Sequence, residues 1–344
     1  MKVAFLLRGG VSYKRGKMRN PREEAYVNIR ACYLATKKYV VDANPQHDID
    51  FFIQSWNPDL KSELIELYKP LDSIFEHNSK YMKEMQDRLT ESRWGTKFLE
   101  EKIGQPQRAG RPICSFRRAG QPVEDWVQWD NGANAESEYH LPQLSQALSI
   151  KLGIQLIEKY EASFCKVENN SLVSNYDLIV IYRPDVMIWK KMDLDFYDTS
   201  KIYCNGAIGS ERSPLAVNAW SHGDLHFVMS PKNAAEFKYV YDSVSKKNPH
   251  KHDDWKGNVN PHDFNEPLEH KWIGNYIRNY MGKELVGDGI KELIDQCIIR
   301  RVWEESWKGH GNTADENFLT GRILKNMGLT HDEIEDIKTY KYKL

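Results

Sequence analysis

The apolar run at residues 178–182 constrains the fold of this chain more than any other feature. Five apolar residues, Leu178 to Tyr182, follow one another without a polar break, which is typical of a strand covered on both faces of its sheet. Arg183, Pro184 and Asp185 come next, and proline has no N–H for a sheet ladder and biases the residue before it towards an extended conformation. We expect the strand to end there and to direct the Asp185 carboxylate out from the sheet edge, where open α/β sheets bind their ligands.

The first half of the chain alternates predicted strands with predicted helices. Apolar runs predict strands at residues 2–7, 49–55 and 73–76, and one-face apolar spacing predicts helices at residues 20–39, 60–68 and 141–160. Asn20 as N-cap and Pro21 in the first turn place the start of the first helix, after a basic loop at Lys14 to Lys17. This order predicts an α/β fold with a Rossmann-like, mostly parallel central sheet flanked by helices.

The second half of the chain carries shorter patterns. They predict strands at residues 201–204 and just before Ser230, a helix at 233–241, and late helices that begin at the capping boxes of Thr313 with Glu316 and of Thr330 with Glu333. Residues 105–121 are rich in proline, glycine and arginine and predict a loop.

Charge and cysteine usage exclude several classes of protein. The formal net charge is -1 and the basic residues form only short, scattered clusters, which argues against a nucleic-acid-binding surface. The five cysteines include no C-x-x-C pair, which predicts reduced thiols in a cytoplasmic protein and no zinc cage. No apolar run is long enough to span a membrane, so we expect no transmembrane segment.

Four stretches in a fixed order suggest a family: KVAFLLRGG, DFFIQSWNP, LSQALSIKLGIQLIEKY and NYDLIVIYRPDVMIW. They resemble nucleotide-sugar glycosyltransferases of the GT-A kind, in particular those of large DNA viruses and of bacterial surface-polysaccharide clusters. The resemblance implies one GT-A-like domain over residues 1–344, with a nucleotide-sugar-binding half at 1–200 and an acceptor-side half with C-terminal helices at 201–344. It also implies a hexosyl- or pentosyltransferase of polysaccharide biosynthesis, in the host cytoplasm if the protein is viral, that transfers sugar from a nucleotide-diphosphate donor to a glycan or glycoconjugate acceptor.

The resemblance also implies a donor site at the strand ends. Its nucleotide-sugar-binding residues are Leu7, Arg8, Gly9, Ser55, Trp56, Arg183 and Asp185. Asp185 is the expected ligand of a Mn²⁺ or Mg²⁺ ion that neutralises the departing diphosphate, although Arg183 stands where the usual D-x-D motif has its first acid. Replacing Asp185 by asparagine is expected to leave the fold intact and to remove most transfer. Asp193-Leu194-Asp195 matches D-x-D literally, but we expect a solvated turn there.

The predicted acceptor-binding side of the protein is based on one later segment, His222 to Ser230. Asp224 is the candidate general base because it precedes a strand within a loop of His and Gly, His226 is a second candidate for that base, and His222 and His226 are the expected acceptor-binding residues. Two alternatives stay open: a metal-dependent phosphoesterase that uses Asp185, Asp224 and the histidines, or a nucleotide-sugar-binding module without catalysis. The sequence leaves open the sugar, the nucleotide, the acceptor, the anomeric outcome and the oligomeric state.

Overall fold

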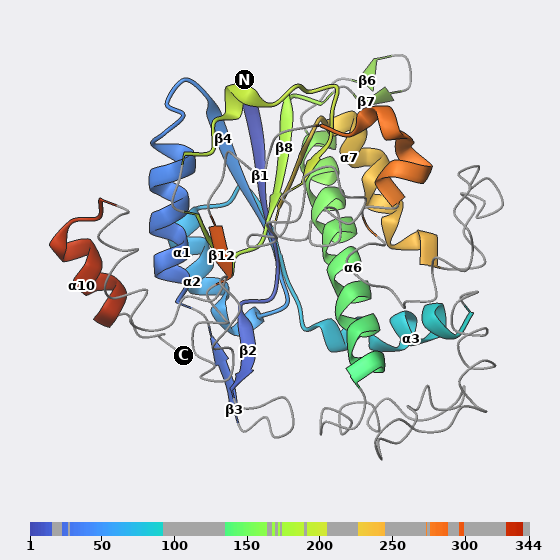
Figure 1. Ribbon diagram of the computed structural model, residues 1–344, viewed down its shortest axis with the longest axis horizontal. Helices are drawn as coiled ribbons and strands as arrows, with labels where there is room; N and C mark the ends of the chain where they lie inside the picture. Colours follow the sequence, from blue (N-terminus) through green and yellow to red (C-terminus); the bar gives the residue numbers. More distant parts are fainter. Residues whose placement is uncertain are drawn as a thin grey trace, which may run out of the picture.

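The fold is built on a six-stranded sheet in the order β10-β11-β8-β1-β4-β5 (Figure 1). The computed structural model describes residues 1–15, 23–26, 28–91, 135–163, 167–168, 171–172, 174–188, 191–204, 226–244, 273, 276–287, 296–298 and 328–339. The strands of the sheet are β1 (Lys2–Gly9), β4 (Asp48–Ser55), β5 (Asp72–Phe75), β8 (Leu178–Tyr182), β10 (Tyr203–Cys204) and β11 (His226–Met229). β1, β4, β5 and β8 are parallel, and β11 runs against both of its neighbours.

Helices cover both faces of this sheet, which confirms the α/β fold with a mostly parallel, Rossmann-like sheet. α1 (Ile29–Thr36) and α2 (Lys61–Tyr68) lie on one side of the sheet, and α6 (Ala135–Ala162) and α7 (Pro231–Phe237) lie on the other (Figure 1). Alternate residues of β1 serve the two faces, because Phe5 belongs to the hydrophobic cluster on the α1 side and Leu6 to the cluster on the α6 side. Covering on both faces explains why β8 needs an uninterrupted apolar run, and all of its residues are buried.

α6 packs closely on β1 because a glycine faces the strand. A Cβ atom added to Gly153 would lie 2.5 Å from Cδ2 and 3.1 Å from Cγ of Leu6. The missing side chain therefore lets the helix backbone approach the sheet, which explains a glycine in the interior of a helix despite its low helix propensity.

The predicted first helix begins later in the structure than its sequence signals suggested. Residues Glu23–Tyr26 form strand β3, which pairs antiparallel with β2 (Ser12–Arg15), so Lys14 also lies in a strand and not in a basic loop. α1 begins at Ile29, because the Asn28 side chain accepts a hydrogen bond from the N–H of Ala31 at 3.1 Å. Asn28 therefore provides the N-cap that the sequence analysis assigned to Asn20, which lies outside the described residues.

Short elements complete the described chain. They are η1 (Lys37–Val41), η2 (Pro58–Leu60), η3 (Asn78–Tyr81), α3 (Met82–Glu91), β6 (Val167–Glu168), β7 (Ser171–Leu172), β9 (Val186–Ile188), η6 (Leu194–Phe196), η8 (Lys238–Val240), η9 (Asp242–Val244), η12 (Ile277–Gly282), η13 (Lys283–Leu285), β12 (Gln296–Ile298) and α10 (His331–Thr339). The capping box of Thr330 and Glu333 is confirmed, since each backbone N–H donates to the other residue's side chain. The capping box at Thr313 and the loop at 105–121 lie outside the described residues. No helix in the described ranges combines the length and the apolar character that a membrane crossing requires.

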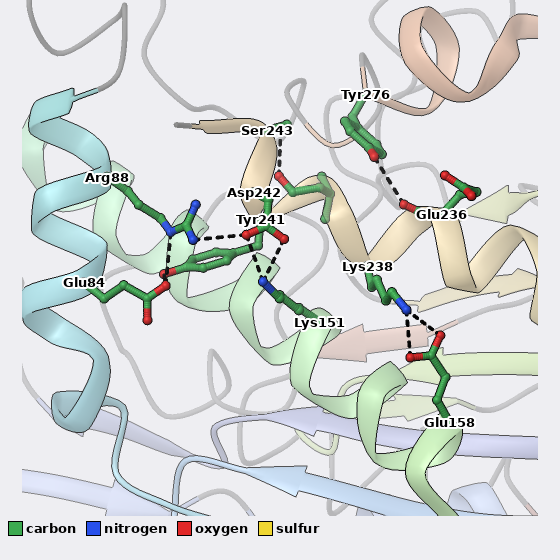
Figure 2. Close-up of polar contacts among 11 residues, drawn as sticks. Glu84, Arg88, Lys151, Glu158, Glu236, Lys238, Tyr241, Asp242, Ser243 and Tyr276 are labelled. Atoms are coloured by element: carbon green, nitrogen blue, oxygen red, sulfur yellow. Dashed lines mark hydrogen bonds and ion pairs between the residues drawn. The ribbon is translucent and has the colours of Figure 1, made fainter. Parts of the chain in front are cut away.

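A charged network joins α3, α6 and the turn after α7 (Figure 2). The Asp242 carboxylate accepts from Lys151 Nζ at 2.7 and 2.8 Å and forms an ion pair with Arg88 Nη2 at 3.1 Å. The Arg88 guanidinium also lies over the Tyr241 ring, 4.4 Å from its centroid. These contacts link parts of the chain that are far apart in sequence.

Candidate functional site

The carboxyl ends of β1, β4 and β8 meet at one edge of the sheet. Gly9 is in register with Ser55 across β1 and β4, and Leu7 is in register with Tyr182 across β1 and β8. This is the lower edge of the sheet in Figure 1, where α6 begins. The structure therefore brings together the strand-end residues that the sequence analysis proposed for a donor site, at the edge where parallel sheets bind ligands.

Gly9 shapes the backbone at this edge. Its φ is +101°, a value that side chains strongly disfavour, and among the described residues no atom lies within 4 Å of the place where a Cβ would stand. The Gly9 N–H donates to Gln54 Oε1 at 3.3 Å, and its carbonyl accepts from the Trp56 N–H at 3.2 Å. The turn after β1 is thus fixed to the end of β4, and the described residues leave one face of Gly9 open.

Leu7 and Arg8 point to opposite faces of the sheet. The Leu7 side chain is fully buried in the hydrophobic cluster on the α1 side, so a ligand at the edge can reach Leu7 only through its backbone. Arg8 is 2% exposed and shares the α6 face with Leu6 by strand alternation. Arg8 therefore places a guanidinium inside the protein at the carboxyl end of β1.

Gln54 is a site residue that the sequence analysis missed. It is in register with Arg8 and is fully buried, and its Nε2 has no hydrogen-bond partner among the described residues. Oε1 accepts from the Gly9 N–H, and Nε2 is the donor that the side chain can present to a ligand. The signal was present in the sequence, since Gln54 interrupts the apolar strand DFFIQS two residues after Phe52, on the same face.

Asp185 does not point out from the sheet edge as predicted. It is fully buried, and its two carboxylate oxygens accept from Arg183 Nε at 2.9 Å and Arg183 Nη2 at 2.7 Å. The reason is the chain after it: Val186 donates to the Arg183 carbonyl at 3.2 Å, and β9 then enters the hydrophobic cluster on the α1 side. The turn is therefore drawn into the protein, and the guanidinium two residues earlier compensates the buried carboxylate.

The Arg183–Asp185 pair does not fit the predicted metal ion. Mg²⁺ and Mn²⁺ need several oxygen ligands around an accessible ion, whereas a guanidinium holds both Asp185 oxygens. Across the described residues, no group of three or more His, Cys, Asp or Glu side chains is placed to hold a metal ion. We therefore derive no step of the chemistry through a metal at Asp185.

The end of β4 continues into an aromatic and acidic corner. Ser55 is fully buried, and its Oγ accepts from the Asn57 N–H at 3.2 Å. Trp56 packs against Tyr81, with ring centroids 5.9 Å apart, and Tyr81 donates to Glu76 at 2.5 Å. Hydrogen bonds from Lys80 first, and then from Tyr81, lower the pKa of Glu76, while burial is the main cause that raises the pKa of Tyr81. The corner is therefore anionic at Glu76 and places Trp56 next to the proposed site.

Only one of the proposed acceptor-side residues is described. His226 is the first residue of β11, is fully buried, and lies beside Tyr182 with ring centroids 6.3 Å apart. Asp224 and His222 lie outside the described residues. The roles of all three as base or acceptor contacts stay predictions.

The literal D-x-D stretch at residues 193–195 is a surface turn, as expected. Asp195 is 59% exposed and pairs with His47 at 3.0 Å, and Asp193 pairs with Lys191 at 3.4 Å. The buried Asn44 side chain holds the segment by donating to the Met192 carbonyl and accepting from the Leu194 N–H. These carboxylates belong to a different surface from the ends of β1 and β4 and are not part of the candidate site.

Comparisons with known proteins add a distant structural likeness. No protein-family model matches the sequence, and no curated protein matches it. Among solved structures, the chain is similar to the apo form of mouse xyloside xylosyltransferase 1, with a TM-score of 0.27 and 8% sequence identity over 82% of this chain and 77% of that chain. The function proposed below rests on the site itself and on the sequence stretches already quoted.

Proposed function

We propose that the protein is a glycosyltransferase that moves a sugar from a nucleotide-diphosphate donor to a glycan or glycoconjugate acceptor. The observation that carries the proposal is Gln54 at the carboxyl edge of a parallel sheet, a fully buried amide whose Nε2 has no hydrogen-bond partner among the described residues. Burying such a group is unfavourable unless it is paired or binds something, and this edge is the ligand-binding edge of α/β sheets. Three of the four sequence stretches that resemble GT-A enzymes contribute the strands β1, β4 and β8 that meet at this edge, and the fourth contributes α6.

The chain's own groups have distinct roles in this proposal. Gly9 allows the donor to approach the backbone, Trp56 offers a ring beside it, and Arg8 and Gln54 offer N–H donors to its oxygens. Asp185 acts as a positioning residue that orients the Arg183 guanidinium towards the site. Asp224 is the proposed base that takes the proton from the acceptor hydroxyl, while the nucleoside diphosphate leaves with the electrons of the broken glycosidic bond.

Turnover of a panel of nucleotide sugars tests the proposal. Transfer or slow hydrolysis of one of them supports it, and a nucleoside diphosphate that matches the active donor should raise the melting temperature by mass action. Release of phosphate from simple esters would instead identify a phosphoesterase. Binding of a nucleotide sugar without transfer or hydrolysis, with any acceptor offered, would identify a binding module and contradict the proposed enzyme.

A pair of glycine variants tests the location of the site. Gly9→Ala forces a side chain into the open face at a φ of +101°, so we expect weaker nucleoside diphosphate binding and a loss of stability of about 1–3 kcal/mol. Gly10→Ala is the matched control, because its Cβ would make an ordinary contact of 3.5 Å with Asn57 Oδ1. Calorimetric titration and thermal melting of both variants check this, and wild-type affinity in Gly9→Ala would place the site elsewhere.

A further inference from the structure

The helix α10 lies on the outer side of α1, which separates it from the central sheet (Figure 1). Its nine residues are fewer than the roughly 12–15 that an isolated helix needs to persist in water. The capping box of Thr330 and Glu333 supports its first turn, but one turn does not maintain a helix. α10 therefore depends on the surface against which it packs.

The apolar contact of α10 is narrow. Leu329 and Ile337 are 9% and 3% exposed and belong to the hydrophobic cluster on the α1 side, and Ile334 packs against the same cluster. Ile334 and Ile337 are three residues apart and thus share one face of the helix. Between His331 and Ile337, only Ile337 is buried. A single stripe of apolar side chains thus attaches α10 to the core.

The start of α1 binds the end of α10 through two polar side chains. Asn28 Nδ2 donates to the Ile337 carbonyl at 2.7 Å, while Asn28 Oδ1 accepts from the Ala31 N–H as the N-cap of α1. Arg30 Nε lies 2.6 Å from an Asp336 carboxylate oxygen. Both side chains of this ion pair are partly exposed, so the pair selects a matching helix more than it adds stability.

The chain after α1 lies next to the start of α10. Lys38 Nζ donates to the Gly328 carbonyl at 2.5 Å. The pKa of Lys37 is raised, first by its hydrogen bond to Asp42 and to a smaller extent by the charge of Glu333. The two helices are therefore antiparallel, and an acidic helix lies against basic side chains of the α1 segment.

Chain connectivity does not restrict α10 to the α1 helix of its own molecule. Residues 299–327 separate β12 from Gly328 in the sequence, and a chain of that length can extend to at most about 100 Å. A second copy of the chain presents the same α1 surface. Exchange of an identical element between copies needs no new complementary surface.

We propose that α10 is an exchangeable helix, and that the α10 docking surface, formed by Asn28, Arg30 and Lys38 with the adjoining apolar cluster, accepts α10 from a second copy of the chain. Two copies that exchange α10 reciprocally form a closed, two-fold symmetric dimer. In dilute solution each α10 occupies its own α1, because the connecting chain gives it a high effective concentration. The inference is independent of the proposed glycosyltransferase activity.

Amide hydrogen exchange of the full-length protein tests whether α10 opens without the rest of the fold. We expect residues 331–339 to exchange about tenfold faster than β1 or more, because few apolar contacts hold them. Ile337→Asp removes an apolar anchor and should speed exchange in α10 further while that of β1 stays within about twofold of wild type. Exchange in wild-type α10 as slow as in β1 would overturn the inference, since the helix would then open only with the whole protein.

Two charge-reversed chains test whether a second copy is the occupant. In Arg30→Asp the docking surface repels its own Asp336, and in Asp336→Arg the helix repels its own Arg30. After mixing, each surface meets a helix of opposite charge only in the other chain. Native mass spectrometry at about 1 mM protein, near the effective concentration of a tethered helix, should show about fivefold more heterodimer than either homodimer.

Two controls separate helix exchange from other association. One chain that carries both Arg30→Asp and Asp336→Arg has a matched pair within the molecule, so its dimer fraction and its α10 exchange should equal those of wild type. Adding Ile337→Asp to both charge-reversed chains removes the apolar anchor and should abolish the heterodimer.

Each outcome supports or overturns the inference. A heterodimer that needs both reversed charges and Ile337 supports it. A mixture that stays monomeric overturns it, as does a heterodimer that survives Ile337→Asp, because another surface then makes the contact. Thermal melts identify variants that fail to fold. If Arg30→Asp fails, a labelled peptide of residues 328–339, with or without Ile337→Asp, is added to the Asp336→Arg chain, and equal binding of both peptides overturns the inference.

Discussion

The Arg183–Asp185 pair shows how a single residue changes the expectation for this site. A carboxylate at the end of a buried strand predicts an exposed ligand for a cation, but here it is interior and paired. A buried pair contributes little net stability, whereas removal of one partner leaves the other charge uncompensated. Asp185 therefore contributes to the stability of the folded protein and not only to its proposed chemistry.

Asp185→Asn should therefore destabilise the protein by about 3 kcal/mol, because Arg183, which is 8% exposed, loses its countercharge. This replaces the expectation from the sequence that the fold stays intact. Urea unfolding at equilibrium measures the difference. Asp195→Asn is the control, since a carboxylate that is 59% exposed should change stability by no more than about 1 kcal/mol. Equal stability of Asp185→Asn and wild type would show that the pair is not needed in the folded state.

At the scale of single residues, the sequence predicted which residues lie at the strand ends better than it predicted which way their side chains point. Arg8, Gly9 and Ser55 lie at the strand ends as expected, because a buried apolar run fixes where a strand ends. The orientation of Asp185 depends on β9 and on β12, which comes from residues 296–298, and local sequence carries no information on such a distant partner. Gln54 was within reach of prediction, since strand alternation alone places it on the same face as Phe52.

At the scale of elements, the contact between α6 and β1 determines how closely the sheet is covered. Gly153 brings the helix backbone against Leu6, which is fully buried. Two effects of a substitution oppose each other there. Alanine would raise helix propensity by up to about 1 kcal/mol, and overpacking a core costs about 1–3 kcal/mol.

Overpacking should prevail in Gly153→Ala, because three Leu6 atoms would lie within 3.1 Å of the new methyl group and have no free space in the core. We expect a net loss of about 1 kcal/mol in the free energy of unfolding, measured by urea denaturation. Gln155→Ala, at an exposed position of the same helix, should leave stability within about 0.5 kcal/mol of wild type. An increase in stability for Gly153→Ala would mean that α6 can move away from the sheet.

Elements with long apolar patterns were predicted well, whereas short polar signals were right for the helix start at Thr330 and wrong for the one at Asn20. α6, β1, β4 and β8 all occur where the periodicity placed them. The predicted start of α1 was wrong, because Asn20-Pro21 and Asn28 both carry the local features of a helix start. Pairing of Glu23–Tyr26 with Ser12–Arg15 decides between them, and this is a tertiary effect that a local pattern does not contain.

At the scale of the whole molecule, the network around Asp242 ties together three separate parts of the chain (Figure 2). Arg88 and Lys151 are each 21% exposed at the side chain and Asp242 is 14% exposed. The contacts are therefore partly shielded from solvent and salt. Loss of the shared anion would leave two cations next to each other and loosen α3 from α6.

Asp242→Asn should lower the free energy of unfolding by about 1–2 kcal/mol and speed amide hydrogen exchange in α3 (residues 82–91) more than in β1. Hydrogen exchange followed by mass spectrometry measures the exchange rates of α3 and of β1 in the same experiment. Lys238→Gln provides the control, since Lys238 pairs with Glu158 of α6 at 2.7 Å and, among the described ion pairs, with no residue of α3. If Lys238→Gln accelerates exchange in α3 as strongly as Asp242→Asn does, the network is not what attaches that helix.

The position of β1 in the sheet has a consequence for how the protein is made. β1 precedes β4 and β8 in the chain, yet it lies in the interior of the sheet between these two strands. β4 follows soon after, while the contact between Lys2 and Asp177 spans 175 residues. The side of β1 that pairs with β8 therefore stays unpaired and apolar until translation has passed Tyr182. We expect the nascent chain to be prone to aggregation during that interval.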